Sequence, residues 1–303
     1  MNRILEGESF PLDEHNRKLL SLVRPEEWRS PEPCAMYNLV VVGAGTAGLI
    51  SALGCAVLGG RVALVERHLM GGDCLNVGCV PSKSLIRSSR AAAEMLHAER
   101  FGLTPSETGA ADFPRVMERL RRIRASIAAN DSAARYASLG VDVFFGDASF
   151  EDGSTIAVDG KKLRFKKAII ATGARAVHPD IPGLDSDFLT NETVFNLTEL
   201  PRRLSVIGGG PIGCELSQAF RRLGSEVVII QQGRFLPRED PEASALLASV
   251  FEREGIRVLL DSKPTAVEKA DGCKHIRVRT PDGERVVEAD AILIGAGRQP
   301  NVE

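Results

Sequence analysis

The chain has 303 residues, enough for about two domains of roughly 150 residues each. It is 44% hydrophobic and 26% charged, and its net charge of −2 gives no electrostatic reason to expect nucleic acid or an anionic membrane as a partner. Six cysteines are too few for a secreted disulfide scaffold of this length, and residues 1–20 contain no apolar core of a signal peptide. We therefore expect a cytoplasmic protein without a membrane span.

The first 35 residues differ in character from the rest of the chain. They are polar and contain several prolines, which favours a peripheral N-terminal arm or a disordered leader at 1–35. The folded region is predicted to begin with an apolar strand at 39–42, a helix at 47–58 and a second strand at 62–66. Further helices are predicted at 84–99 and 114–138.

A repeated pattern organises the rest of the chain. Residues 141–165 alternate and turn like short antiparallel strands, and a buried strand then ends at Thr172-Gly173. Residues 204–230 repeat the order strand, glycine turn, helix, strand. The repeat predicts an α/β fold with two Rossmann-like units, each a parallel sheet with flanking helices and a small antiparallel layer. The predicted domains are 36–180 and 181–303.

The first glycine turn fits the dinucleotide fingerprint G-x-G-x-x-G. Gly43 makes the tight turn, Gly45 lets backbone N–H groups approach a pyrophosphate, and Gly48 lets the helix pack closely on the strand. An acid, Glu66, stands at the end of the next strand, where a carboxylate can accept hydrogen bonds from a ribose diol. The turn therefore predicts a nucleotide site.

The second glycine turn has the same spacing but lacks the acid. The equivalent strand-end position is Gln231, which does not repel a 2′-phosphate as a carboxylate would. Arg234 and Arg238 lie just beyond it, either as phosphate contacts or as solvated side chains. We predict a site permissive for NADPH. The residues of this turn are Gly208, Gly210, Pro211, Ile212 and Gly213.

Two cysteines, Cys74 and Cys79, stand in the glycine-rich stretch "GGDCLNVGCVPSK". Zinc sites usually need a second pair of ligands, which the sequence does not show, and a static disulfide has no purpose in a reducing cytosol. In a straight helix the Cα atoms of these residues would lie about 8 Å apart, beyond the usual disulfide limit of about 7 Å. Gly78 could let the turn distort, and a strained, easily cleaved bond would suit a catalytic pair. We predict no metal site.

The cysteine stretch resembles the redox-disulfide signature of the FAD-dependent pyridine nucleotide–disulfide oxidoreductases, which include dihydrolipoamide dehydrogenase, glutathione reductase and mercuric reductase. The resemblance extends over residues 37–301 and includes "ATGARA" at 171–176, "GGGPIGCEL" at 208–216 and "ADAILIGAGRQPN" at 289–301. The sequence "PREDPEA" at 237–243 is similar to the mercuric reductase branch.

The resemblance implies a reaction and a set of roles. A hydride would pass from NAD(P)H on the second unit to FAD on the first, and electrons would then reduce the Cys74–Cys79 disulfide, which acts on a disulfide or a thiol-bound metal ion. Cys79 would sit against the flavin and Cys74 would attack the substrate, beside an ion pair of Lys83 with Glu215. Further implied cofactor contacts are Thr46, Ala47, Gly72, Thr172, Gly173 and Gly297.

The sequence also departs from the family. It ends at Glu303, where relatives continue into an interface domain that supplies a His–Glu pair to the partner subunit, and it has no C-terminal cysteine pair. We therefore expect a truncated form of a homodimeric enzyme, incomplete for turnover by itself. Two alternatives remain open, namely a non-catalytic flavin- or nucleotide-binding module and a cysteine-based redox or metal sensor.

Overall fold

The computed structural model describes residues 11–104 and 111–302. The chain forms two compact units. Among the described residues, the first unit contains 11–81, 120–175 and 300–302, and the second contains 82–104, 111–119 and 176–299. Among the helices of the described ranges, none is both long and apolar enough to cross a membrane.

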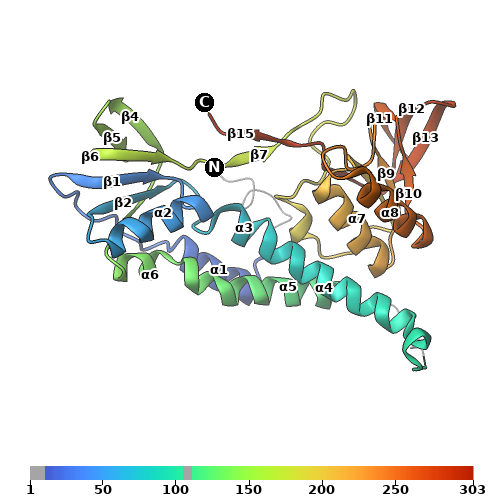
Figure 1. Ribbon diagram of the computed structural model, residues 1–303, viewed down its shortest axis with the longest axis horizontal. Helices are drawn as coiled ribbons and strands as arrows, with labels where there is room; N and C mark the ends of the chain where they lie inside the picture. Colours follow the sequence, from blue (N-terminus) through green and yellow to red (C-terminus); the bar gives the residue numbers. More distant parts are fainter. Residues whose placement is uncertain (1–10, 105–110, 303) are drawn as a thin grey trace. The chain divides into compact units, whose positions relative to one another are not determined.

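The first unit is built on a six-stranded sheet in the order β3-β2-β1-β6-β5-β4 (Figure 1). Strands β3, β2, β1 and β6 are parallel to one another, with the apolar β1 and β2 paired in the centre. Strands β5 and β4 extend the sheet in antiparallel pairing. The strands are β1 (Tyr37–Val42), β2 (Val62–Glu66), β3 (Val141–Phe145), β4 (Ala148–Asp152), β5 (Thr155–Val158) and β6 (Lys161–Ile170).

The helices of the first unit are α1 (Glu14–Val23), α2 (Thr46–Val57), α3 (Gly72–Asn76) and α6 (Ala133–Ser138), with a 3₁₀ turn η2 (Ala128–Asp131). Two longer helices, α4 (Cys79–Leu96) and α5 (Phe113–Ile127), begin in one unit and end in the other. The predicted helix at 114–138 is thus divided, because the Ser132 hydroxyl accepts a hydrogen bond from Arg135 N and starts α6 as a new helix.

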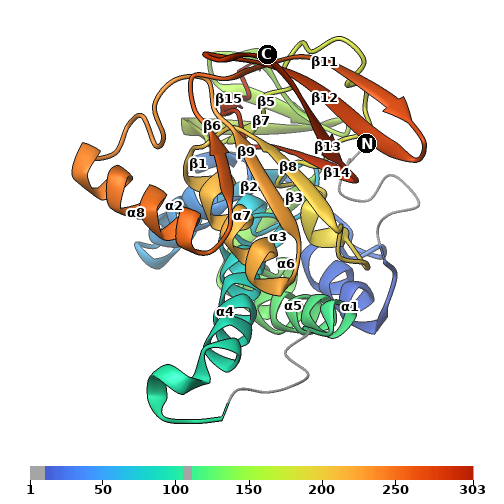
Figure 2. The same ribbon diagram turned by 90° about the vertical axis from the view of Figure 1, so that its right-hand side faces the viewer.

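The second unit combines a parallel sheet in the order β10-β9-β8-β14 with an antiparallel sheet β11-β12-β13 (Figure 2). Buried aliphatic side chains of both sheets form one core. The strands are β8 (Arg203–Ile207), β9 (Glu226–Ile230), β10 (Arg257–Leu259), β11 (Lys263–Ala270), β12 (Cys273–Thr280), β13 (Gly283–Ala289) and β14 (Ala291–Ile294). The helices are α7 (Pro211–Leu223) and α8 (Pro241–Arg253), with η1 (Ala98–Phe101) and η3 (Val194–Asn196). The short strands β7 (Ala174–Ala176) and β15 (Arg298–Pro300) form a further ladder.

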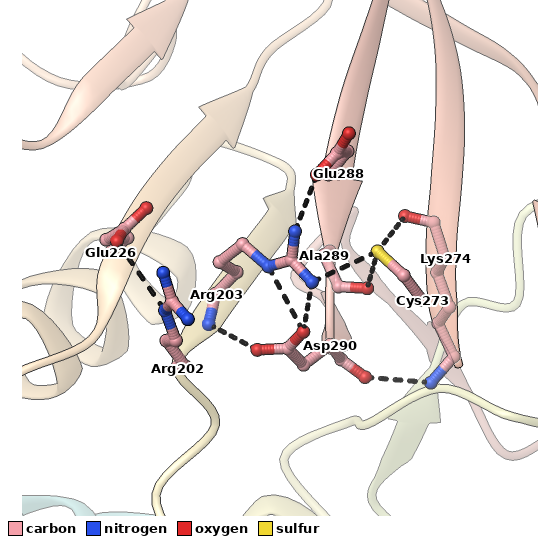
Figure 3. Close-up of polar contacts among 8 residues, drawn as sticks. All are labelled: Arg202, Arg203, Glu226, Cys273, Lys274, Glu288, Ala289 and Asp290. Atoms are coloured by element: carbon pink, nitrogen blue, oxygen red, sulfur yellow. Dashed lines mark hydrogen bonds and ion pairs between the residues drawn. The ribbon is translucent and has the colours of Figure 1, made fainter. Parts of the chain in front are cut away.

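A polar cluster joins β8 to the end of β13 (Figure 3). The Arg203 guanidinium donates to Asp290 at 2.7 Å and to Glu288 at 2.6 Å, and it also reaches the Cys273 sulfur at 3.2 Å. The hydrogen bond from Arg203 holds the pKa of Asp290 below its usual value. Cys273 is therefore part of a hydrogen-bonded cluster of the second unit.

The α/β fold with two Rossmann-like units is confirmed, but two local expectations were wrong. Strand β3 lies parallel to β2, not in the antiparallel layer, because the chain reaches it through a helical crossover that ends with α6. Residues 11–35 are not a peripheral arm, since α1 buries Leu19 and Val23 in the core and Trp28 donates to the Val143 carbonyl at 3.1 Å. Residues 1–10 of the predicted arm lie outside the described residues.

Two glycines of α2, Gly48 and Gly54, allow the effect of close packing on stability to be distinguished from the effect of helix propensity. A Cβ added to Gly48 would overlap the carbonyl oxygen of Gly43, whereas a Cβ added to Gly54 would meet nothing within 4 Å. We expect Gly48→Ala to lower the free energy of unfolding by about 1–3 kcal/mol through overpacking. Gly54→Ala, the matched control on the same helix, should raise it by about 0.5–1 kcal/mol. Urea unfolding of both variants tests this, and an equal effect at the two positions would contradict it.

Candidate active site

The first glycine turn has no room for a side chain at Gly43 or at Gly48. Gly43 has a φ of +103°, and a Cβ there would overlap the carbonyl oxygen of Ala171. Gly45 precedes α2 and offers no side-chain cap, so the first N–H groups of the helix are not satisfied by it. Thr46 and Ala47 are exposed in the first turn. The turn is thus a cradle in which backbone N–H groups and the positive end of a 12-residue helix can hold a pyrophosphate.

Glu66, at the end of β2, is fastened to this turn. One of its carboxylate oxygens accepts from Ala44 N at 2.7 Å and the other accepts from His68 N at 2.7 Å. Burial raises the pKa of Glu66 above its usual value, against the effect of these two hydrogen bonds. The acid therefore fixes the shape of the turn and remains the predicted acceptor for a ribose diol.

The second glycine turn repeats this construction in the second unit. Gly208 has a φ of +113° and a Cβ there would lie 2.5 Å from the Gly295 carbonyl oxygen, while a Cβ on Gly213 would overlap the Gly208 carbonyl oxygen. Gly210 precedes α7, and Pro211 occupies its first turn. Ile212 follows on α7. The N-terminus of α7 thus follows a glycine turn that has no room for a side chain at Gly208 or Gly213.

Gln231 occupies the position that Glu66 has in the first unit. Its side-chain oxygen accepts from Gly209 N at 2.6 Å, as Glu66 accepts from Ala44 N. Its amide nitrogen donates to the carbonyl oxygens of Gln232 at 2.9 Å and Arg234 at 3.1 Å. The Gln231 amide therefore holds the loop after β9 in place. Unlike Glu66, it carries no negative charge.

The two arginines after β9 differ in their surroundings. The Arg234 guanidinium donates to the Pro237 carbonyl oxygen at 2.6 Å and to that of Glu239 at 3.4 Å, so it braces its own loop. Arg238 is exposed. The geometry thus distinguishes the two cations that the sequence treats alike, and a phosphate contact of either one stays a prediction.

The cysteine pair spans a break between two helices. Cys74 lies in α3 and Cys79 is the first residue of α4, with Val77 and Gly78 between the helices. A Cβ on Gly78 would lie 2.8 Å from the Asp73 carbonyl oxygen, so the turn needs glycine to close this tightly. The straight helix that would keep the sulfurs apart is therefore absent.

The two sulfurs are thiols here and lie within hydrogen-bonding reach of each other. Burial raises the pKa of the Cys74 thiol, and its hydrogen bond and charge interaction with Cys79 raise it further. Cys74 is half-buried, whereas Cys79 is exposed at the N-terminus of an 18-residue helix, where the helix dipole favours negative charge.

The loop that carries the two cysteines, residues 71–79, contacts the first glycine turn directly, and we call it the cysteine loop. Gly71 N donates to the Ala44 carbonyl oxygen at 2.9 Å. A Cβ on Gly72 would lie only 2.5 Å from the Cα of Gly45, so the two backbones touch. The Thr46 hydroxyl also forms a hydrogen bond with Cys74. Any nucleotide bound on this turn would therefore lie next to the cysteine pair.

Two further contacts involve predicted site residues. In the second unit, Lys83 Nζ donates to both carboxylate oxygens of Glu215 at 2.7 and 2.9 Å, so the structure brings these residues together. In the first unit, the Thr172 hydroxyl donates to the Asn301 carbonyl oxygen at 2.7 Å, and Asn301 N donates to Gly173 O at 3.0 Å. Gly297 is exposed with a φ of +116°.

Sequence reasoning missed several residues that shape this site. Ala44 and Gly71 act through backbone atoms alone, which no residue type reveals. Asn301, which fastens Thr172-Gly173, lies in a motif noted only for the resemblance. Asn76, whose side chain ties the cysteine loop to itself, stands between the two cysteines. It is the one polar residue between Cys74 and Cys79, and that is the signal that could have found it.

The remaining cysteines are placed differently. Cys214 is buried on α7, and burial raises the pKa of its thiol to about 12. Within residues 11–104 and 111–302, no group of three or more His, Cys, Asp or Glu side chains is arranged to hold a metal ion.

Comparison with known proteins agrees with this geometry. Residues 37–303 match the family described as pyridine nucleotide-disulphide oxidoreductase. A mercuric reductase of Lysinibacillus sphaericus is 35% identical over 273 residues, covering 88% of this chain and 49% of that protein. A dihydrolipoyl dehydrogenase of Acholeplasma laidlawii is 32% identical over 272 residues, covering 88% and 79%.

Solved structures show the same relationship. The HOCl-induced flavoprotein disulfide reductase RclA from Escherichia coli superposes with a TM-score of 0.73 and 29% identity, covering 88% of this chain and 57% of that one. The chain spans about half the length of the mercuric reductases that it matches.

The raised pKa of Glu66 has a consequence for stability. Because the folded chain keeps this proton to a higher pH than the unfolded chain, stability falls as pH rises from the ordinary glutamate pKa through the raised one. Glu66→Gln keeps an acceptor for Ala44 N but does not titrate. We expect the stability of Glu66→Gln relative to the unmodified chain to increase across this window, by about 1.4 kcal/mol for each unit of pKa shift.

Urea unfolding at intervals between about pH 4 and pH 8 measures this difference. Glu27→Gln, which alters an exposed carboxylate of the same unit, is the matched control. Parallel stability curves for Glu66→Gln and the unmodified chain would show that burial does not control this group.

Proposed function

Because this chain belongs to the pyridine nucleotide-disulphide oxidoreductase family, we propose that it is the redox-cysteine portion of an NAD(P)H-dependent flavoprotein in which Cys74 and Cys79 form the working dithiol–disulfide pair. One observation carries the proposal, namely the docking of the cysteine loop on the first glycine turn through Gly71 and Gly72. A static disulfide would need no nucleotide cradle beside it. A nucleotide-binding module without redox chemistry would need no cysteine pair there.

The cofactors of the family are FAD and NAD(P)H, and the two turns fit them. In each turn the glycine before the helix, Gly45 or Gly210, has no neighbour closer than 3.8 Å to its Cβ position, which leaves room for a closely approaching pyrophosphate. Gly43, Gly45 and Glu66 would hold FAD, and the turn from Gly208 to Gly213 would hold NAD(P)H. When bound, FAD supplies the redox chemistry that links hydride transfer from a nicotinamide to the two-electron reduction of a disulfide. The domain assignment, 36–180 for FAD and 181–303 for NAD(P)H, is part of this proposal.

The chain's own residues prepare the dithiol for exchange. Oxidation of the pair transfers two electrons and releases two protons, and its reverse returns both thiols. Since the pKa of Cys74 is raised, its proton must be removed before the sulfur attacks a substrate. The Cys79 sulfur, hydrogen-bonded to Cys74 at the N-terminus of α4, is in place to exchange that proton. We assign Cys74 the role of the attacking thiol once it is deprotonated, and Cys79 the role of its partner in the disulfide.

The ion pair of Lys83 with Glu215 fixes the position of an ammonium group whose charge the carboxylate balances. Its two short hydrogen bonds hold the ammonium in one position although both side chains are partly exposed. An exposed pair contributes little to stability, about 0–1 kcal/mol, and the resemblance implies a functional role for it. We assign it to stabilising negative charge that develops during reduction.

The substrate class is a disulfide or a thiol-bound metal ion. The relatives' names support both, since mercuric reductases and dihydrolipoyl dehydrogenases match with similar identity. Both substrates are handled by the same dithiol, which either exchanges with a disulfide or delivers electrons to a thiolate-bound metal. A homodimer of the whole protein is part of the same proposal.

Thiol alkylation tests the placement of the cysteines. In the reduced chain without cofactor, we expect iodoacetamide to modify Cys79 before Cys74, because Cys79 is exposed and the Cys74 thiol is half-buried with a raised pKa. Adding FAD should protect Cys79 and reverse the order. Mass spectrometry of the cysteine peptides after short exposures measures both rates, with Cys34 as an internal reference. An unchanged Cys79 rate in excess FAD would contradict the proposed flavin position.

Coenzyme binding tests the second turn. Gln231 should leave it without a strong preference for NADH, and a phosphate contact from Arg238 should favour NADPH by about tenfold, or about 1.4 kcal/mol. Arg238→Ala should remove this preference, whereas Gln231→Glu should shift it to NADH. Binding of each coenzyme, followed by fluorescence quenching, gives the ratio. Arg234→Ala is the comparison, since that guanidinium braces its own loop. Strong NADH preference in the unmodified chain would refute this assignment.

A further inference from the structure

Helix α1 lies against the cysteine loop, although it precedes the residues that match the family. Its buried side chains Leu19 and Val23 belong to one core with Leu69, Met70 and Leu75, which lie immediately before and within the loop. Both views of the ribbon show α1 beside α5 (Figures 1 and 2). Helix α1, which belongs to the predicted N-terminal arm, therefore packs against the cysteine loop.

A buried arginine on α5 links this helix to the loop between the cysteines. One guanidinium nitrogen of Arg124 donates to the side-chain oxygen of Asn16 at 2.7 Å, and the other donates to the backbone carbonyl oxygen of Asn76 at 2.7 Å. Arg124 is 1% exposed and burial lowers its pKa to about 10. A cation in such a place costs free energy unless its hydrogen bonds are kept, so neither link is incidental.

Asn76 passes this constraint to the start of the loop. Its side-chain nitrogen donates to the carbonyl oxygens of Met70 at 3.0 Å and Gly72 at 2.9 Å. Asn76 is 2% exposed and ends α3, immediately before the break that brings the sulfurs together. Holding its carbonyl oxygen therefore holds the last turn of α3, which carries Cys74.

The C-terminal end of α1 fastens the other side of the loop. Met70 N donates to the Val23 carbonyl oxygen at 3.1 Å. The Arg24 guanidinium donates to the carbonyl oxygens of Arg67 at 2.8 Å and His68 at 2.9 Å. The segment between β2 and α3 is thus held at both ends by α1, directly at one end and through Arg124 at the other.

The N-terminal end of α1 is itself anchored. The Asp13 carboxylate accepts from Asn16 N at 2.8 Å as the helix cap, and its other oxygen accepts from Arg121 Nε. Asn16 also donates its side-chain nitrogen to the Pro11 carbonyl oxygen at 2.7 Å. Asn16 is consequently fixed in position on both sides before it meets Arg124.

We propose that Asn16 and Arg124 are positioning residues for the redox pair: they hold the Asn76 carbonyl, and thereby set the effective concentration of the Cys79 sulfur at Cys74. The proposal rests on the proposed function, because it concerns the same dithiol. It makes α1 a determinant of how readily the disulfide forms. Loosening the link lowers that effective concentration and makes the disulfide easier to reduce.

Equilibration of the full chain with glutathione tests this directly. Two thiols of the chain and one oxidised glutathione give one intramolecular disulfide and two reduced glutathiones. We expect the equilibrium constant of this exchange to fall about tenfold in Asn16→Ala and Arg124→Met, which equals about 30 mV for a two-electron couple. Asn16→Asp keeps the acceptor for Arg124 and should restore it. The double variant should show no more than the larger single effect, because both residues act through one link.

Two controls separate positioning from a loss of stability. Lys18→Ala alters an exposed side chain of α1, and Ile156→Ala weakens a different core of the same unit. Neither should change the exchange equilibrium, although Ile156→Ala lowers stability. If Asn16→Ala leaves the equilibrium unchanged, or Ile156→Ala shifts it equally, the positioning role is overturned. If the unmodified chain forms no Cys74–Cys79 disulfide at any glutathione ratio, the proposed function fails as well.

Discussion

The contact between Gly45 and Gly72 is the constraint on which the rest of the site depends. The two backbones approach so closely that a single Cβ on Gly72 would lie 2.5 Å from the Cα of Gly45. This contact joins the loop that carries the cysteines to the turn that has the geometry of a dinucleotide cradle. Gly71 strengthens it through its hydrogen bond to Ala44. The cysteine pair and the turn proposed to hold a nucleotide are thereby placed at one point, and the close contact at Gly72 accounts for a glycine at that position.

The two units share the same hydrogen bond between the end of the second strand and the glycine turn. In each, a side-chain oxygen at the end of the second strand accepts a backbone N–H of the glycine turn, from Glu66 in the first and Gln231 in the second. The fastening needs only an acceptor, so glutamate and glutamine both provide it. The side-chain charge is the remaining difference between the two positions, and the proposed function assigns coenzyme choice to it.

The parts of this fold that depend on local pattern could be predicted from the sequence. Strand β1, the glycine turn and α2 follow from an apolar run, three spaced glycines and a helical period, and Gly78 indicates the break between the cysteines. The role of α1 could not be predicted, because its polar composition hides two buried apolar residues and Asn16 meets Arg124 only after folding. Contacts between residues so distant in sequence leave no local pattern. The parallel pairing of β3 was missed for the same reason.

The central claim is that a flavin site and a redox-active dithiol operate together in this chain. Anaerobic reductive titration of the FAD-reconstituted chain, followed by flavin absorbance, tests it most directly. The account predicts that each bound flavin is accompanied by uptake of two electron pairs, one by the flavin and one by the disulfide of Cys74 and Cys79. The variant Cys79→Ser should take up one pair. Uptake of a single pair by the unmodified chain, with flavin bound and the cysteines still oxidised, would contradict the account.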